Sequence, residues 1–95
     1  MQQSITKKLP NGKLVRLFVE AQATVTSLKI TGDFFAHPEE CIEDMEQLLV
    51  GLPVTTLAKE IQEKLDEYVT ENSILLVGLT TEALAGMIEE ALKHG

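Results

Sequence analysis

Hydrophobic residues change their spacing along this chain at about residue 31. Before that point they alternate with polar residues, the period of two that buries one face of a β-strand. After it they recur every three or four residues, which is typical of helices with one buried side. The pattern therefore predicts an α+β fold: a three-stranded antiparallel sheet over about residues 4–31, with three helices, over about residues 38–50, 56–69 and 81–93, packed on one face of it.

The first turn indicates how the first two strands pair. It lies within Leu9–Lys13, where Pro10 lacks the N–H that a two-residue turn would require. We therefore expect a three-residue loop that begins at Pro10 and ends at Gly12 in a left-handed conformation. This loop places Ile5 beside Leu17.

A second loop, at Gln22-Ala23, brings the third strand back beside the second and pairs Leu17 with Leu28. By parity, the opposite face of the sheet carries a mixture of basic and apolar side chains: Lys8, Leu14, Arg16, Phe18 and Lys29. Arg16 would lie opposite Lys29, and facing like charges cost stability unless solvent or a negative group relieves them. This face is therefore either a solvated outer surface or a docking surface for another protein.

The stretch Thr31-Gly32-Asp33-Phe34-Phe35 joins the predicted sheet to the predicted helices. Gly32 permits a backbone conformation that other residues resist, and Asp33 is suited to turns. Phe34 and Phe35 are two of only four aromatic residues in the chain. We expect at least one of them to fill the seam between sheet and helices; the alternative is direct contact with a ligand or a partner.

Local signals indicate where the helices begin. Pro38 suits the first position of the first helix. Thr55 or Thr56 is expected to cap the second helix, with Leu57 on its buried side. The apolar run Ile74–Leu79 is compatible with a buried strand or with a segment that crosses the core, and periodicity does not distinguish them.

Composition and charge restrict the class of protein. A chain of 95 residues with 44% hydrophobic content forms one globular domain, residues 1–95. Residues 1–32 carry five bases against one acid, whereas residues 33–95 carry fourteen acids against three lysines. The total of −7 argues against nucleic acid as a partner. The sequence shows no signal peptide and no apolar run long enough to cross a membrane, so we expect no membrane association and a cytoplasmic location.

No residues with the pattern of a catalytic or metal site stand out. The single cysteine, Cys41, excludes an internal disulfide and a multi-cysteine metal site. The glycines are scattered rather than gathered into a phosphate-binding loop, and no nucleophile, base and orienting group can be assembled. The residues thus predict a binding or accessory module without catalytic residues and without a metal.

Four segments together resemble the C-terminal domain of lipoate–protein ligases. They are Gly12–Arg16, Gly32–Phe35, the predicted helix Cys41–Leu49 ending in Leu48–Pro53, and Gly78–Leu84, and the resemblance covers nearly the whole chain. The most specific parts are Gly-Asp-Phe-Phe and Leu-Val-Gly-Leu-Pro, neither of which is a catalytic signature. The family fold, a three-stranded antiparallel sheet with helices on one face, agrees with the pattern derived above.

The resemblance implies a role beside a catalytic partner. In this family the domain follows a larger catalytic domain or, in some archaea, forms a separate accessory subunit. A chain that starts at Met1 without a catalytic domain looks like the separate form, so we expect a heterodimer with a lipoate–protein ligase catalytic subunit. That subunit would use lipoate, ATP and Mg to form lipoyl-AMP before transfer to a lysine of a lipoyl domain. This chain would bind no cofactor and have no activity by itself.

The basic and apolar sheet face and the corner beside it are the expected contacts with that subunit. The candidate residues are Lys8, Leu14, Arg16, Phe18, Lys29, Gly32, Asp33, Phe34 and Phe35. The acidic helices are expected to remain in solvent. Acceptor lipoyl domains in this family are generally acidic, so an acidic chain is expected to meet them only indirectly.

Two other interpretations remain open at this stage. The family fold is similar to that of sulfur-transfer and iron–sulfur scaffold proteins, which suggests a sulfur acceptor using Cys41. The second alternative is a structural module that associates with itself through Leu14 and Phe18.

Overall fold

The computed structural model describes residues 1–10 and 13–93. Its elements in chain order are β1 (Gln2–Lys8), β2 (Leu14–Ala21), β3 (Val25–Gly32), β4 (Phe35–His37), α1 (Cys41–Leu49), α2 (Ala58–Glu71), β5 (Leu75–Val77) and α3 (Thr81–Lys93). The first three strands form an antiparallel sheet in the order β1-β2-β3. The predicted α+β fold with three antiparallel strands and three helices is therefore confirmed.

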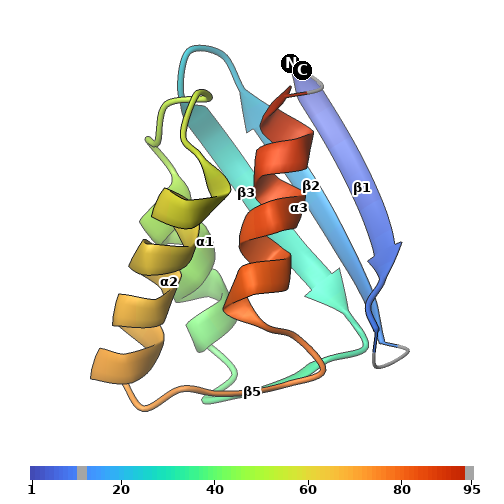
Figure 1. Cartoon of the computed structure of the whole chain (residues 1–95), viewed down its shortest axis with the longest axis vertical. Helices are drawn as coiled ribbons and strands as arrows, with labels where there is room; N and C mark the ends of the chain where they lie inside the picture. Colours follow the sequence, from blue (N-terminus) through green and yellow to red (C-terminus); the bar gives the residue numbers. More distant parts are fainter. Residues whose placement is uncertain (11–12, 94–95) are drawn as a thin grey trace.

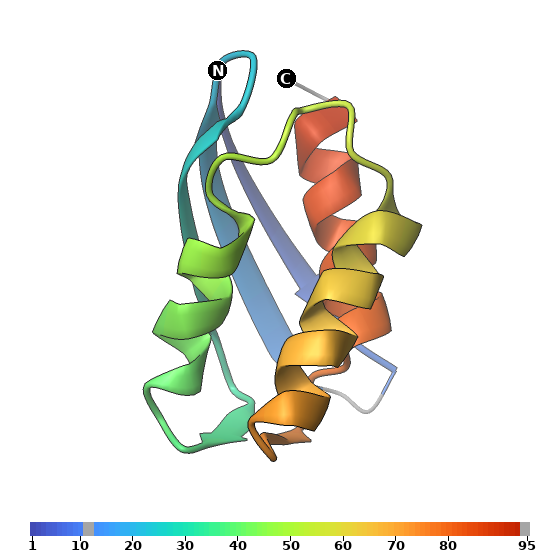
Figure 2. The ribbon, with the colours of Figure 1, turned by 90° about the vertical axis from the view of Figure 1, so that its left-hand side faces the viewer.

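The helices are arranged around one side of the sheet (Figure 1). Helix α3 packs over β1 and β2, α1 runs beside β3, and α2 packs against α3 and α1. Seen from the side, the strands and the pair α2–α3 form separate layers (Figure 2). The opposite face of the sheet is left uncovered by the described residues.

The core lies between the inner face of the sheet and the helices. Alternate residues of β2 are fully buried, as the period of two predicts. The largest fully buried side chains include Leu17, Met45, Ile61, Leu65 and Leu84, which come from the sheet and from all three helices. Burial of each such side chain contributes about 1.5–3 kcal/mol, so this core determines which faces of the elements meet.

The first hairpin has the predicted register. Ile5 lies opposite Leu17, and the backbone N–H of Leu9 donates to the carbonyl of Lys13 at 2.8 Å, which closes a three-residue loop. The predicted conformation of Asn11-Gly12 lies outside the described residues.

The predicted register of the second hairpin is wrong by two residues. Leu17 lies opposite Ile30 rather than Leu28, because the register shifts between Glu20 and Ala21 and the loop is longer than two residues. A shift of two residues preserves parity, since side chains alternate with a period of two. The inner and outer faces of the sheet are therefore the predicted ones.

A second, two-stranded sheet joins segments that are far apart in the sequence. Strands β4 and β5 pair antiparallel from Phe35 opposite Val77 to His37 opposite Leu75. Part of the Ile74–Leu79 run is thus a strand. The predicted helix start at Pro38 is wrong, since α1 begins only at Cys41, after a turn that follows β4.

The predicted start of α2 is also wrong. The helix begins at Ala58, and the hydroxyl of Thr56 donates to the carbonyl of Pro53 at 2.6 Å instead of capping the helix. Leu57, expected on the buried side, is 53% exposed. The first N–H of the helix, that of Ala58, is instead satisfied by the carboxylate of Glu89 on α3 at 2.7 Å.

This bond between two helices makes stability depend on pH. The hydrogen bond from Ala58, and then the neighbouring Lys93, hold the pKa of Glu89 below its ordinary value of 4.5. A carboxyl whose pKa is lower in the folded state stabilises the fold above its unfolded pKa and loses that contribution as the pH falls through the folded pKa. Glu89→Gln is uncharged at every pH. We therefore expect its urea midpoint to lie below that of the wild type at pH 7 and to converge with it below pH 4.5.

Urea titrations of both proteins at several pH values measure this difference. The other carboxyl groups titrate equally in both proteins, so the difference between the midpoints isolates Glu89. Glu63→Gln, at an exposed position within α2, is the control, and its midpoint is expected to stay close to that of the wild type throughout. If the urea midpoints of Glu89→Gln and wild type still differ by the same amount at acid pH, the proposed role of the hydrogen bond from Ala58 to Glu89 is wrong.

The outer edge of β3 is covered by α1 and by the loop that follows it. The buried carboxylate of Glu46 accepts the N–H of Ile30 at 2.7 Å. Further along the strand, Gly51 N–H donates to Val25 C=O and Val25 N–H donates to Leu52 C=O, each at 2.8 Å. An open strand edge invites pairing with another chain, and these bonds remove much of that possibility at β3.

Candidate partner-binding surface

The uncovered face of the sheet brings together five residues predicted from parity. They are Lys8 on β1, Leu14, Arg16 and Phe18 on β2, and Lys29 on β3. Leu14 is 37% exposed and Phe18 is half-buried, while the three cationic side chains are exposed. An apolar centre among cations is the composition expected of a surface that binds a protein, because aromatic residues and arginine are enriched in such interfaces.

One predicted feature of this face is absent. Arg16 does not lie opposite Lys29, since the shifted register places Arg16 opposite Thr31 and Lys29 opposite Phe18. On its other side, the Arg16 Nε donates to the hydroxyl of Thr6 at 3.4 Å. The cations are therefore distributed over the face and separated by neutral residues, so this face carries positive charge without the strain of directly facing like charges.

The corner after β3 adjoins this face through Leu14. The backbone of Gly32 lies so close to β2 that an added Cβ would be 2.2 Å from the Leu14 carbonyl oxygen. That oxygen accepts the N–H of Asp33 at 2.9 Å. Gly32 and Asp33 thus fix the end of the outer face, as the sequence suggested.

The two phenylalanines of the corner point in different directions. Phe34 is half-buried and packs against the core, which confirms that one aromatic ring fills the seam. Phe35 is 54% exposed and lies on the small β4–β5 sheet. Of the nine predicted contact residues, the structure therefore places five on the outer face and two at its end, while Phe34 turns inward and Phe35 belongs to a separate patch.

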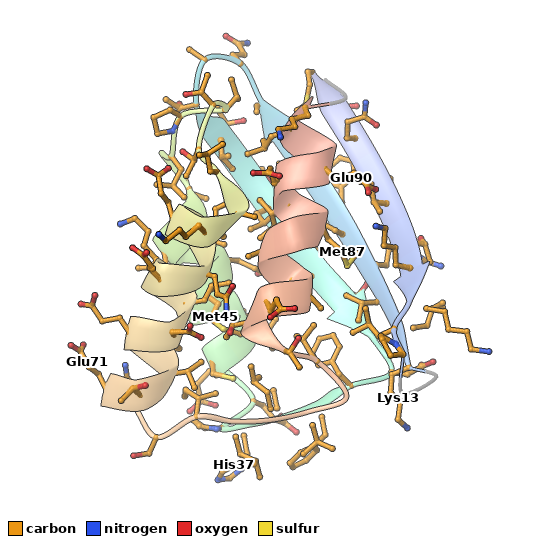
Figure 3. All side chains as sticks on the ribbon, viewed as in Figure 1. Lys13, His37, Met45, Glu71, Met87 and Glu90 are labelled. Atoms are coloured by element: carbon orange, nitrogen blue, oxygen red, sulfur yellow. The ribbon has the colours of Figure 1, made fainter. Side chains whose placement is uncertain are left out.

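Two further residues of that patch were not predicted from the sequence. Leu75 and Val77 are each about half exposed, and the register of β4 with β5 puts them on the same side as Phe35 and His37. His37 points away from the body of the molecule at the end opposite the termini (Figure 3). The run Ile74–Leu79 gave no signal of this exposure, since an unbroken apolar run is typical of a buried segment.

The other side of the molecule is acidic. Glu43 and Asp44 lie in the first turn of α1, and Glu60 lies in that of α2. Figure 3 shows Glu71 at the far end of α2 and Lys13 on the opposite side, at the end of the sheet. The charge segregation of the sequence therefore corresponds to two sides of the folded domain.

Cys41 does not have the surroundings of a reactive thiol. Its side chain is fully buried at the start of α1. Burial, and then the negative charges of Asp44 and Glu40, raise the pKa of the Cys41 thiol, which opposes formation of the nucleophilic thiolate. Nearby, partial burial and a hydrogen bond to Asp44 raise the pKa of Tyr68 to about 12.

Two other features, a metal site and a membrane-spanning helix, are absent from residues 1–10 and 13–93. In those residues there is no group of three or more His, Cys, Asp or Glu side chains that could hold a metal ion. The same residues contain no helix that is both long enough and apolar enough to span a membrane.

These features define a small α+β module with one open, basic and apolar sheet face. Residues 1–88 match the family described as Bacterial lipoate protein ligase C-terminus, and the chain belongs to that family. No curated protein matches the sequence.

The same fold occurs in a solved structure. It comes from an archaeal lipoylation system, a bi-partite lipoate protein ligase and its E2 lipoyl domain from Thermoplasma acidophilum. A chain of that structure superposes with a TM-score of 0.71 over 93% of this chain and 97% of that chain, at 20% identity. At that identity the likeness establishes the shared fold.

Proposed function

We propose that this chain is a non-catalytic accessory part of a two-component lipoate–protein ligase. It binds a separate catalytic subunit, which uses lipoate, ATP and Mg, and it promotes activation of lipoate to lipoyl-AMP before transfer to a lipoyl domain. The observation that carries the proposal is the family match over residues 1–88. The structural relative from a bi-partite ligase system supports an arrangement in two components.

The open face of the sheet suggests how such a module acts. Leu14 and Phe18 offer apolar area to a partner, and the surrounding cations orient the contact. The mixed anhydride of lipoyl-AMP is hydrolysable, so a module that closes over the catalytic site protects it from water and orders the surrounding loops. This role requires surface complementarity rather than reactive groups on the accessory chain.

The other interpretations have less support. A sulfur acceptor needs an accessible thiolate, whereas Cys41 is fully buried and its pKa is raised. Direct recruitment of acidic lipoyl domains through the helices is disfavoured by the acidic side chains on that side. Self-association through Leu14 and Phe18 would use the same face, and the size of the free chain in solution separates it from binding to the catalytic subunit.

The proposal is tested by measuring the two half-reactions separately. Release of pyrophosphate from ATP and lipoate reports adenylation, and transfer from preformed lipoyl-AMP to a lipoyl domain reports the second step. Using the catalytic subunit from the same organism, we expect this chain to accelerate pyrophosphate release at least about ten-fold and to change transfer much less, because closure acts on the first step.

A Cys41→Ser variant serves as the control, since its thiol has no part in this role. It should accelerate pyrophosphate release as the wild type does once it is shown to be folded. If the catalytic subunit forms lipoyl-AMP equally fast without this chain, the accessory role is wrong.

A further inference from the structure

The two edges of the main sheet differ in how their backbone groups are satisfied. The N–H of Leu9 bonds to Lys13, and the carbonyl of Met1 accepts the N–H of Ala21, so odd-numbered residues of β1 face β2. Because an antiparallel ladder alternates, the backbone groups of Gln2, Ser4, Thr6 and Lys8 point to the free edge.

No backbone group of another described segment pairs with this edge of β1. The edge of β3, in contrast, is covered by Glu46 and by residues 51–54. An exposed seven-residue edge strand is a template for an added strand, and proteins usually block such edges. Only one of the two edges of this sheet is blocked in that way among the described residues.

A second observation lies at the end of the same strand. A cavity of about 330 Å³ opens beside Leu9 and Pro10, which directly follow β1. Its apolar walls include Leu79, which precedes α3, and Ala83 in the first turn of α3, and its other lining residues are Gly78, Thr80 and Glu82. An extended segment that pairs with β1 runs towards this cavity, which has room for an apolar side chain.

The charge around the edge indicates what kind of segment fits. The charged residues of β1 itself are Lys7 and Lys8, and the strand carries no acid. Lys7 pairs with Glu90 of α3 at 2.8 Å, whereas Lys8 is exposed on the open side of the sheet. A segment with acidic side chains is complementary to this edge, and a second copy of the same basic strand is not.

We infer that the free edge of β1 accepts an extended, acidic segment of the catalytic subunit as a fourth strand, with an apolar side chain of that segment in the cavity beside Leu9. This inference rests on the proposed function. Binding through the open face of the sheet could occur without strand addition, so strand addition at β1 is a separate contact. Backbone pairing supplies register, and the cavity and Lys8 supply selectivity for the segment.

Hydrogen exchange of the complex with the catalytic subunit from the same organism tests this mode of binding. In the free chain the amides of Ser4 and Thr6 face solvent and exchange fast. We expect their exchange to slow at least about ten-fold in the complex, as bonded amides do. Protection of other surfaces without protection of residues 2–8 overturns the added strand and leaves the proposed function intact. Failure to form any complex overturns both.

Two variants at one position isolate the backbone. Ser4→Pro removes an outward N–H that no described residue uses, and proline is tolerated at a strand edge. We expect Ser4→Pro to bind the catalytic subunit at least about ten-fold more weakly and Ser4→Ala to bind within about two-fold of wild type. Melting curves confirm that both are folded. Equal affinities of the two variants contradict strand addition.

The acidic character of the segment has its own test. Lys8→Glu is expected to weaken binding several-fold, whereas the same reversal at exposed Lys59 on α2 should not. If protection of residues 2–8 instead rises with the concentration of this chain by itself, the occupant is a second copy, and the assignment to the catalytic subunit is wrong.

Discussion

The double variant Arg16→Glu, Phe18→Ser is expected to bind the catalytic subunit about one hundred-fold more weakly than wild type. Both side chains lie on the outer face of β2, where Arg16 is exposed and Phe18 is half-buried. Aromatic and arginine residues at the centre of an interface each cost about 1–2 kcal/mol or more when removed, and reversal of a charge adds repulsion. Titration of the catalytic subunit with each protein, followed by calorimetry, measures the change in affinity.

The functional consequence follows from that affinity. At concentrations near the wild-type dissociation constant, the variant should fail to stimulate pyrophosphate release, and stimulation should return when its concentration is raised about one hundred-fold. Such recovery distinguishes weakened binding from a chain that has lost its fold. A folded variant that stimulates as the wild type does would show that the outer face is not the docking surface.

A matched control lies on the helical side. Leu57 is an exposed apolar residue, and Lys59 is an exposed cation close to it at the start of α2. The variant Leu57→Ser, Lys59→Glu removes one apolar and one basic side chain, as the test variant does. We expect it to bind like wild type, and a loss of binding confined to this control would place the interface on the helices.

The parts of the fold that follow local rules were predictable from the sequence. Alternation assigned Leu17 to the core and Arg16 to the outer face, and both assignments held even though the β2–β3 register was wrong by two residues. Parity survives an even shift, whereas register depends on loop length and on the bulge at Glu20 and Ala21, for which the sequence carries no local signal.

The errors in the starts of the helices share a physical cause, which is contact between distant segments. The pairing of Phe35 with Val77 joins two three-residue strands on either side of α1 and α2, and neither strand has a distinctive pattern. Because of that pairing His37 lies in a strand, and the first helix begins only at Cys41. Likewise, the first N–H of α2 is satisfied by Glu89 of another helix, and no local pattern in the sequence indicates that contact.

The candidate surface was predictable to a similar extent. The five residues of the outer face follow from strand parity, so the sequence identified them as a group. The exposed side of β4–β5 and the free edge of β1 depend on which strands and helices happen to cover them. Those features are properties of the assembled fold, and only the structure reveals them.

Gly32→Ala is expected to destabilise the domain by about 2–4 kcal/mol. The new methyl group would lie 2.2 Å from the carbonyl oxygen of Leu14, a distance at which the two strands must separate. The same carbonyl accepts the N–H of Asp33, so separation also loses a hydrogen bond at the end of the sheet. For a domain of this length the loss corresponds to a fall in Tm of about 10–25 °C.

Gly86→Ala is the matched control because Gly86 lies within α3 and, apart from the neighbouring backbone of its own helix, no described atom lies within 4 Å of the position of its added Cβ. Alanine favours a helix over glycine by about 0.5–1 kcal/mol, so this variant should be more stable than wild type. If Tm falls for Gly32→Ala and rises for Gly86→Ala, the loss at Gly32 is due to crowding there and not to a general effect of adding a methyl group. If both variants have the same Tm as the wild type, the close approach of Gly32 to Leu14 does not stabilise the end of the sheet.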